Sequence, residues 1–572
     1  MIAIATKRLH NERRTQSSPP AGRAPLVSGA TLAAAAILSL VGTSAYFNSF
    51  GGEFIFDDIQ AILENPNIES IWPLSKSMSA PHETTVSGRP IVSLSLALNY
   101  LISSRRVWSY HAFNLAVHVL AGITLFGIIR RTLLSGRLKD RFGQSAWPIA
   151  VTCAAIWLAH PVGTQAVTYV IQRAESMMAL FCLVTLYCAI RSFQSKHRIL
   201  WQLAAVFFCG VGMGTKETMV TVPVLVLVYD GVFSGLSFRN ILRNRWKLYL
   251  MLAGTWTILA FLMYSGPRQG SAGFGLQTFT PLTYAQTQCG AILHYIRLAF
   301  WPSPLVLDYQ RKIATSFGDY ALQGSAVIVL LSATVLALRY WPAVGFLGAW
   351  FFLILSPTSS FVPIADPVFE HRMYLPLAAI VSAVVVTAWL LFRRLLSESP
   401  KAALITKLTI VVATVGLLAG LTYRRNCDYR TRISIWTDTV AKQPGSRRAH
   451  LQLGGAYRRA GQYDQAIASS TRSLAIDPNY PRAYLNRGIA YAVKGLYPKA
   501  ISDLQEAIRL DPDYYLAYAN RGVTYLHMGQ YRKAIQDFNR AIELRPRDPW
   551  LRQGLQEAFD LMRQADSAAT GN

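Results

Sequence analysis

The chain has 572 residues, of which 52% are hydrophobic and only 15% are charged, and its formal net charge is +26. A soluble domain carries about a quarter charged residues. The shortage here comes from ten or so apolar segments of roughly 14–22 residues, several long enough to cross about 30 Å of hydrocarbon. This composition excludes a soluble enzyme, a secreted disulfide scaffold and a disordered chain. Because the positive charge belongs to a membrane protein, no nucleic-acid partner is expected.

A basic N-terminus, residues 1–27, precedes a first apolar segment that is too long for a signal-peptide core and is expected to remain as an anchor. Two other apolar stretches, residues 89–102 and 285–301, are expected to form interfacial or re-entrant helices on the outer side. The predicted domain is polytopic and covers residues 28–422. Its eleven predicted spans are residues 28–48, 109–129, 147–160, 176–193, 199–214, 217–230, 246–265, 320–338, 341–356, 373–392 and 403–421.

Charge predicts the orientation of these spans. Lys and Arg gather in the connections at residues 130–141, 191–198, 239–247 and 393–407. Connections rich in Lys and Arg face the cytoplasm in membrane proteins. We therefore expect a cytoplasmic N-terminus, with the first outer loop, residues 49–108, and the C-terminal tail on the outer side.

The C-terminal part is built from repeats. Gly454, Gly488 and Gly522 are 34 residues apart, and the same step relates sets of tyrosines, alanines and prolines. This period and pattern are typical of tetratricopeptide repeats, which are pairs of helices stacked into a solenoid. The fold class predicted for the whole chain is therefore all-α. We expect repeats and flanking helices over residues 428–564, full repeats near 446–479, 480–513 and 514–547, and a flexible tail at 565–572.

The first outer loop contains the strongest candidate for catalysis. Asp57 and Asp58 are adjacent and lie just beyond the first span, between Phe54, Phe56 and the later Trp72. A carboxylate in this position could deprotonate the hydroxyl group of an acceptor. The alternative is a helix cap or a solvated turn. No metal is required for this chemistry, although the pair could also bind a divalent ion.

Further ionisable side chains lie near the outer ends of the predicted spans. Such groups are costly at membrane depth and often functional, and cations there would suit the phosphate of a lipid-linked substrate. Each of them alone could also be structural. The candidates for binding a donor phosphate or sugar are Arg89, His160, Arg173, Lys216, Glu217, His371 and Arg372.

The repeats offer a candidate site for a polypeptide. Gln452, Asn486 and Asn520 occupy the same position of successive repeats, on the first helices that line the concave groove of such arrays. A side-chain amide both donates and accepts hydrogen bonds, so a row of amides could hold an extended peptide. The alternative is that they only cap or solvate the helices.

Several motifs together carry a family resemblance. They are Phe-x-Phe-Asp-Asp at 54–58, Arg-Pro-x-x-x-Leu-Ser-x-x-Leu-Asn-Tyr at 89–100, Tyr-His-x-x-Asn-x-x-x-His at 110–118, His-Pro at 160–161, Lys-Glu at 216–217 and Arg-x-Tyr-Leu-Pro at 372–376. With the repeats, they resemble the transmembrane and tetratricopeptide-repeat protein O-mannosyltransferases over nearly the whole chain. That resemblance implies the C-type glycosyltransferase fold and a polyprenyl-phosphate sugar as donor.

The resemblance also implies roles for individual residues. Asp57 would be the general base on a Ser or Thr hydroxyl, and Asp58 its acidic partner. Arg173, Lys216 and Arg372 would lie near the donor phosphate. Gln165 departs from the pattern, because glutamate is expected there. The basic N-terminus and short loops favour a bacterial member in the inner membrane, with its repeats in the periplasm and envelope or secretory proteins as acceptors.

Two other functions remain open from the sequence. The chain could be another lipid-linked-sugar transferase, with a lipid, a glycan or an oligosaccharide as the acceptor. It could also be a non-enzymatic, membrane-anchored scaffold, since repeat arrays are usually binding modules. A scaffold would have no need of the Asp57–Asp58 loop.

Overall fold

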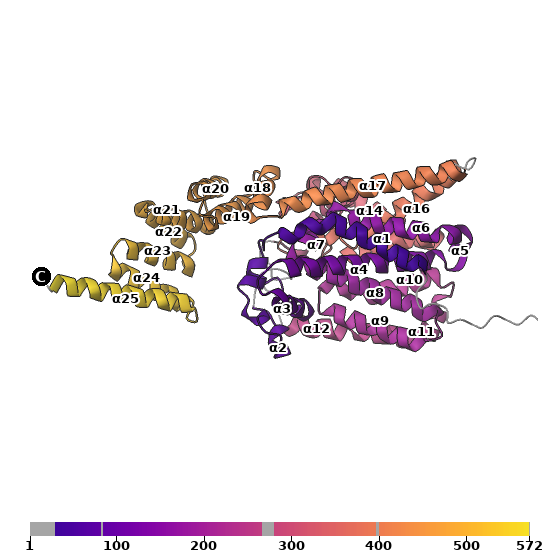
Figure 1. The fold of residues 1–572 in the computed structure, drawn as a ribbon, viewed down its shortest axis with the longest axis horizontal. Coiled ribbons are helices and arrows are strands. Elements are labelled where there is room, and N and C mark those ends of the chain that lie inside the picture. Colours follow the sequence, from indigo (N-terminus) through magenta and orange to yellow (C-terminus); the bar gives the residue numbers. More distant parts are fainter. Residues whose placement is uncertain (1–28, 82–83, 266–278, 396–399, 571–572) are drawn as a thin grey trace, which may run out of the picture.

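The computed structural model describes residues 29–81, 84–265, 279–395 and 400–570, and the regular elements of these ranges are helices (Figure 1). A bundle of long, roughly aligned helices is followed by an array of shorter helix pairs that leaves one end of the bundle. The all-α fold class is therefore confirmed. The predicted basic N-terminus lies outside the described residues.

Every predicted span coincides with a helix or a pair of consecutive helices. Within the described ranges, eight stretches are long and apolar enough to cross a membrane, whereas α9 and α15 are shorter apolar helices. The chain is thus a multi-pass membrane protein, and the total of eleven spans stays a prediction. The helices at the predicted spans are α1 (Gly29–Tyr46), α4 (Trp108–Leu133), α6 (Ala146–Ala159), α8 (Arg173–Gln194), α9 (Arg198–Met213), α10 (Val222–Phe233), α11 (Phe238–Gly254), α12 (Trp256–Ser265), α14 (Phe317–Tyr340), α15 (Pro342–Leu355), α16 (Leu377–Leu395) and α17 (Pro400–Asp428).

The two ambiguous apolar stretches are also helices, α3 (Pro90–Ser103) and α13 (Pro281–Phe300). At 1.5 Å per residue, the 14 residues of α3 extend about 21 Å, which is less than the hydrocarbon thickness. Figure 1 shows α3 at the same end of the bundle as the repeats, together with α2 (Leu74–Ser77) and α7 (Thr164–Thr168). This end carries the candidate site.

The bundle is held together by close packing around α4. A Cβ atom at Gly122 would lie 2.7 Å from the side chain of Leu158 in α6, so only glycine permits this approach. His118 of α4 hydrogen-bonds through Nδ1 to the hydroxyl of Tyr374 at 2.6 Å, and Trp157 donates from Nε1 to the Tyr374 carbonyl at 2.8 Å. These contacts fix the segment just after Arg372 against the core.

The repeats fold as predicted. The helices are α18 (Arg432–Lys442), α19 (Arg447–Arg459), α20 (Tyr463–Ile476), α21 (Pro481–Val493), α22 (Tyr497–Leu510), α23 (Tyr515–His527), α24 (Tyr531–Leu544) and α25 (Pro549–Thr570). The repeated spacing of the glycines has a packing cause, since a Cβ at Gly488 would lie 3.0 Å from Leu504 of the paired helix. Gly495 turns the chain between the two helices with φ +73°, a region that favours glycine.

Two helices extend further than the predicted boundaries. α17 continues to Asp428. α25 continues to Thr570 and so includes residues 565–570 of the predicted tail. The residues after 564 include three alanines, which are strong helix formers, so the helix continues where the polar composition indicated a tail.

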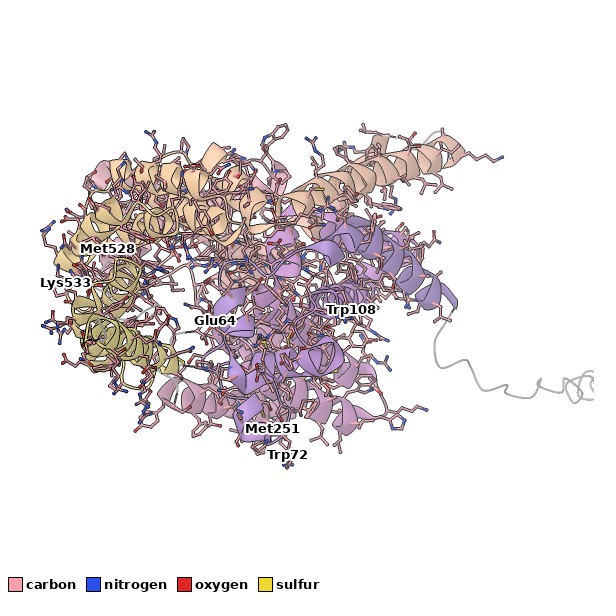
Figure 2. All side chains as sticks on the ribbon, turned by 60° about the vertical axis from the view of Figure 1, so that its left-hand side comes forward. Glu64, Trp72, Trp108, Met251, Met528 and Lys533 are labelled. Carbon is pink, nitrogen blue, oxygen red and sulfur yellow. The ribbon has the colours of Figure 1, made fainter. Side chains whose placement is uncertain are left out.

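The array curves around the end of the bundle. Figure 2 shows Met528 and Lys533 on the outer side of the array, and Glu64 of the first outer loop on the bundle beside it. The junction is made by α18, where Trp436 packs edge-to-face on Phe56 with ring centroids 5.4 Å apart. Arg432 also donates from Nε to the Phe54 carbonyl at 2.9 Å. The repeats are therefore attached directly to the loop that contains Asp57.

Candidate functional site

Asp58 holds the first outer loop against the start of α8. Its Oδ2 accepts the backbone N–H of Ile55 at 3.0 Å, and its Oδ1 accepts the backbone N–H of Ile171 at 2.8 Å. The side chain is fully buried. Burial raises the pKa of Asp58 to about 8, against the effect of the two amide hydrogen bonds. Both oxygens are thus engaged within the protein, and the residue shapes the loop.

Asp57 lies at the turn of the same loop. The preceding Phe56 has φ +43°, which is unusual for a bulky residue and marks a sharp bend. The backbone N–H of Asp57 donates to the hydroxyl of buried Tyr169 at 2.9 Å. Burial raises the pKa of Asp57 to about 6, with a further rise from Asp366, while the Tyr169 hydroxyl and Arg448 act in the opposite direction. A base with this pKa is suited to proton abstraction near neutral pH.

Arg448 connects the first repeat to two loops of the membrane domain. From α19, its Nε donates to Asp308 Oδ2 at 2.8 Å, and its Nη2 donates to Asp366 Oδ1 at 2.7 Å. Asp308 is almost fully buried. Arg448 and Asp366 also act on the pKa of Asp57, so the four charges belong to one neighbourhood. Sequence reasoning missed Asp308, Asp366 and Arg448, because no local motif marks them.

A second group of charges brings together four of the predicted donor-binding residues. Arg89 is 3.2 Å from Glu217, and Lys216 pairs with buried Glu175. Burial lowers the pKa of His371 well below its usual range, and the charges of Lys216, Arg372 and Arg89 lower it further. Arg89 keeps a buried Nε without a hydrogen-bond partner among the described residues. We call Arg89, Lys216, Glu217 and His371 the basic cluster.

Gln165 joins this cluster to α7. Its Oε1 accepts the backbone N–H of His371 at 2.9 Å and lies 3.1 Å from His371 Nδ1. The glutamine that departs from the family pattern is therefore in direct contact with a predicted site residue. An amide here holds His371 without adding a negative charge.

The other predicted donor residues use their polar atoms within the fold. Arg173 is fully buried and donates to Asn99 Oδ1 at 2.6 Å and to the Tyr110 carbonyl at 3.1 Å. Arg372 donates to the carbonyls of Pro367 at 2.8 Å and Asp366 at 2.6 Å. Both arginines hold neighbouring segments in place, and their contact with a donor stays a prediction.

His160 has a similar position at the end of α6. Its Nε2 lies 3.1 Å from the Ala299 carbonyl, and its Nδ1 accepts the backbone N–H of Val162 at 3.3 Å. The side chain is nearly fully buried and connects the turn after α6 to the end of α13. Its predicted role in binding the donor is not tested by these contacts.

A cavity of about 600 Å³ opens beside the loop that contains Asp308, and no sequence motif predicted it. His294 contributes a buried Nε2 that has no hydrogen-bond partner in the described part of the chain. Tyr309 lines the same cavity and donates to Glu370 at 2.8 Å, next to His371. The cationic residues of the lining are Arg297, Arg311 and Lys312.

The amides of the repeats are partly used within the array. Asn486 donates to the Leu451 carbonyl at 3.4 Å, and Asn520 donates to the Leu516 carbonyl at 2.7 Å. All three predicted residues, Gln452 included, are half-buried. The neighbouring Arg487 is bound to Asp503 by two hydrogen bonds of 2.8 Å, so its charge is already compensated. Whether the amides bind a peptide stays a prediction.

The metal considered at Asp57 and Asp58 finds no support in the side-chain arrangement. Among the described residues, no group of three or more His, Cys, Asp or Glu side chains could hold a metal ion. Both oxygens of Asp58 are bound by backbone amides. The donor set for a metal at this position is therefore incomplete.

Comparisons with known proteins identify the repeats. The family model described as "Tetratricopeptide repeat" matches residues 481–514 and 515–548, and the model described as "TPR repeat" matches residues 454–495. A solved structure, the first TPR domain of the human RPAP3 protein, is 27% identical, covers 22% of this chain and 98% of that chain, and has a TM-score of 0.21. The repeats predicted from the 34-residue period are confirmed.

Curated relatives carry one common description. The Protein O-mannosyl-transferase F38B6.6 of Caenorhabditis elegans is 23% identical over 78% of this chain and 63% of the relative. Protein O-mannosyl-transferases tmtc2 of Xenopus laevis and TMTC3 of Homo sapiens are each 29% identical, over 34% and 33% of this chain and 23% and 20% of those proteins. The chain thus spans less than two thirds of each of these relatives. In its sequence and in its tetratricopeptide repeats, it resembles the protein O-mannosyl-transferases.

Proposed function

We propose that this chain is a protein O-mannosyltransferase of the C-type glycosyltransferase class that takes its sugar from a polyprenyl phosphate and uses Asp57 as the general base. The observation that carries the proposal is the setting of Asp57. This carboxyl group has a pKa of about 6 and sits in the loop to which the repeats are attached. The names of the relatives support mannose transfer to protein.

The proposed reaction is a single displacement. The oxygen of a Ser or Thr hydroxyl attacks the anomeric carbon of the sugar, and the bond between that carbon and the phosphate oxygen breaks. Asp57 takes the hydroxyl proton. The released polyprenyl phosphate gains negative charge, which preorganised cations stabilise.

The basic cluster is the proposed place for that phosphate. Arg89 and Lys216 are its cations, and each is paired with a carboxylate. Each could bind a phosphate oxygen in addition to that carboxylate or in its place. The buried, unpartnered Nε of Arg89 is a hydrogen-bond donor available for this purpose. Asp58 shapes the loop instead of contacting the reactants, because its two oxygens are already bound.

The acceptor would arrive from the aqueous side. The repeats lie beside the loop that contains Asp57, and their groove would hold an extended segment of the acceptor polypeptide through Gln452, Asn486 and Asn520. The proposed setting is the inner membrane of a bacterium, with the N-terminus in the cytoplasm and the repeats in the periplasm.

The test is transfer of labelled mannose from polyprenyl-phosphate mannose by the purified full chain, followed by mass spectrometry of the products. We expect mannose on Ser or Thr of envelope proteins, and a loss of about 10²–10⁴-fold in Asp57→Asn. Glu64→Gln is the matched control, because Glu64 is an exposed carboxylate of the same loop. Mannose found only on lipid or glycan would favour another transferase, and no transfer would favour a scaffold. Unchanged transfer by the folded Asp57→Asn variant would overturn the base assignment.

A further inference from the structure

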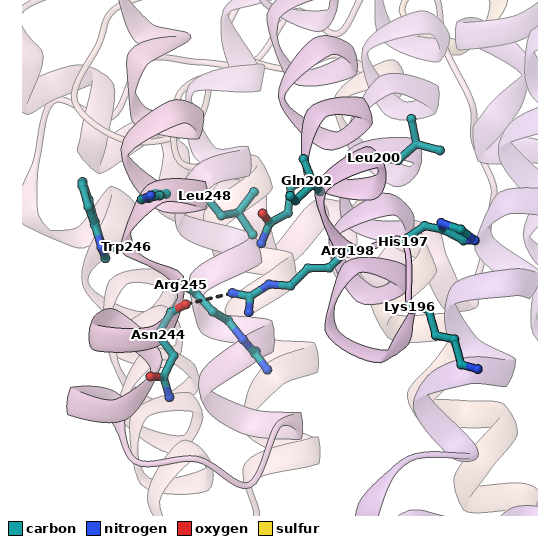
Figure 3. Close-up of a pocket in the computed structure, with 11 residues that line it drawn as sticks. Lys196, His197, Arg198, Leu200, Gln202, Asn244, Arg245, Trp246 and Leu248 are labelled. Atoms are coloured by element: carbon teal, nitrogen blue, oxygen red, sulfur yellow. Dashed lines mark hydrogen bonds between the residues drawn. The ribbon is translucent and has the colours of Figure 1, made fainter.

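A second cavity, of about 710 Å³, lies between the connection from α8 to α9 and the first half of α11 (Figure 3). The connection contributes Lys196, His197 and Arg198, and α11 contributes Arg245, Trp246 and Lys247. Figure 3 shows the Arg198 side chain reaching across from α9 to the carbonyl of Asn244, a hydrogen bond of 2.8 Å. The cavity is thus bounded by two separate segments.

This cavity is far from the candidate catalytic site. α8 begins at Arg173, two residues after Ile171, whose backbone amide binds Asp58, and it ends at Gln194, close to Lys196. Its 22 residues extend about 33 Å at 1.5 Å per residue, which is close to the hydrocarbon thickness of a bilayer. α9 leads back from Arg198 to Met213, near Lys216 of the basic cluster. The two sites therefore lie at opposite ends of the bundle.

The cavity has an uncompensated positive charge. Its lining contains no Asp or Glu. Arg245 is neutralised by an ion pair with Asp230, and its guanidinium lies 4.0 Å above the ring centre of Phe193. Lys196, Arg198 and Lys247 have no ion-pair partner among the side chains that the structure describes. Three cations without an ion-pair partner thus belong to the lining of a single cavity.

Apolar side chains flank this charge on both helices. Leu200 of α9 is 67% exposed, Leu250 of α11 is 62% exposed and Trp246 is 52% exposed in the isolated chain. Both helices belong to the bundle, so these side chains face the acyl chains when the protein is in a membrane. Tryptophan is enriched where hydrocarbon meets the headgroups. The cavity therefore sits where a lipid headgroup lies, with hydrocarbon contacts next to it.

We propose that this cavity binds the headgroup phosphate of an anionic phospholipid. The phosphate oxygens accept hydrogen bonds from Lys196, Arg198 and Lys247, and the acyl chains run along the exposed apolar side chains of α9 and α11. Basic pockets between membrane helices are suited to such headgroups, and arginine supplies paired donors to phosphate. The site is independent of the proposed glycosyl transfer, because it uses none of the same residues.

Native mass spectrometry of the full chain, extracted from vesicles of phosphatidylcholine with and without phosphatidylglycerol, tests the proposal. We expect phosphatidylglycerol to stay bound in preference to phosphatidylcholine. In the triple variant Lys196→Gln, Arg198→Gln, Lys247→Gln, retention should fall on the order of 100-fold, since each cation near a membrane contributes roughly fivefold to the binding of anionic lipid. The single variant Lys196→Gln should show a smaller loss. It tests the site even if the triple variant does not fold.

The matched control is Lys139→Gln, Arg239→Gln, Arg243→Gln. It removes three exposed basic residues from α5 (Gly136–Phe142) and α11, outside the cavity lining. Retention in this control should equal that of the unaltered chain. An equal loss in both triple variants would show a general charge effect and overturn the site. Equal retention of both lipids, or displacement of phosphatidylglycerol by millimolar inorganic phosphate, would also overturn it.

Discussion

At the scale of single residues, two adjacent aspartates have different environments. Asp57 is partly buried beside Tyr169, Asp366 and Arg448, whereas Asp58 is fully buried with both oxygens bound by backbone amides. The sequence places them side by side but cannot assign these roles, because the amides of Ile55 and Ile171 come from different segments. The environments lead to separate predictions for the two residues.

The proposed transfer should depend on pH through Asp57. A general base works in its deprotonated form, so kcat/KM should rise with pH, with an apparent pKa of about 6, and then reach a plateau. The measurement is the rate of transfer to a synthetic acceptor over the range of about pH 5 to 8. In Asp57→Asn the remaining activity should lose this dependence. A rate that is flat across pH 6 in the unaltered enzyme would contradict the assignment.

Asp58→Asn should act mainly on stability. An asparagine has one oxygen and an NH₂ group, so one of the two amide donors loses its partner and faces another donor. A buried hydrogen-bonding group without a partner costs about 1–3 kcal/mol. Thermal unfolding in detergent should therefore show a lower Tm for Asp58→Asn than for Asp57→Asn. Equal Tm values would mean that the loop is held by other contacts.

Arg448 is a positioning residue for the proposed base. Its charge lowers the pKa of Asp57, and its loss also removes the arginine that hydrogen-bonds to the carboxylates of Asp308 and Asp366. In Arg448→Gln, the apparent pKa of transfer should move upward, and Arg448→Lys should restore part of the shift. Arg447→Gln is the matched control, since Arg447 is exposed and pairs with Asp477 instead. A loss of activity without a change in the pH profile would indicate a structural role alone.

At the scale of helices and repeats, the sequence is informative wherever a pattern is periodic. A membrane-spanning helix forms its backbone hydrogen bonds within itself, so each span is visible in the sequence as one continuous apolar run. The 34-residue period located the paired helices in the same way. Contacts such as Arg448 with Asp308 join residues 140 apart and leave no local pattern. The same is true of the cavity at His294, whose lining comes from several segments.

The row of amides in the repeats leads to a prediction about acceptor use. Changing Asn486 and Asn520 together to Ala should weaken transfer to a protein acceptor and spare a short synthetic acceptor, because only the protein reaches the groove. The amide of Asn520 also bonds within its own helix, so the fold of the variant is checked by circular dichroism. Equal loss with both acceptors would point to a stability effect, and no loss would exclude the groove from acceptor selection.

At the scale of the whole molecule, orientation in the membrane decides which end meets a lipid-linked donor. The candidate site and the repeats lie at one end of the bundle, and α5 lies at the other (Figure 1). The basic connections at residues 130–141, 191–198 and 239–247 belong to the α5 end, which the charge rule places in the cytoplasm. Because these connections lie at one end of the bundle, the predicted topology requires all of them to be on the same side of the membrane.

That topology predicts opposite results for two reporter fusions. A reporter that is active only outside the cytoplasm should be active when fused after Asn572 and silent when fused near Gly136, which begins α5. The same reporter joined at Lys196 should also be silent, since this residue lies about 33 Å along α8 from the end that carries the site. An active reporter at Gly136 with a silent one at Asn572 would invert the bundle. Asp57 would then face the cytoplasm, and the proposed transfer to exported proteins would fail.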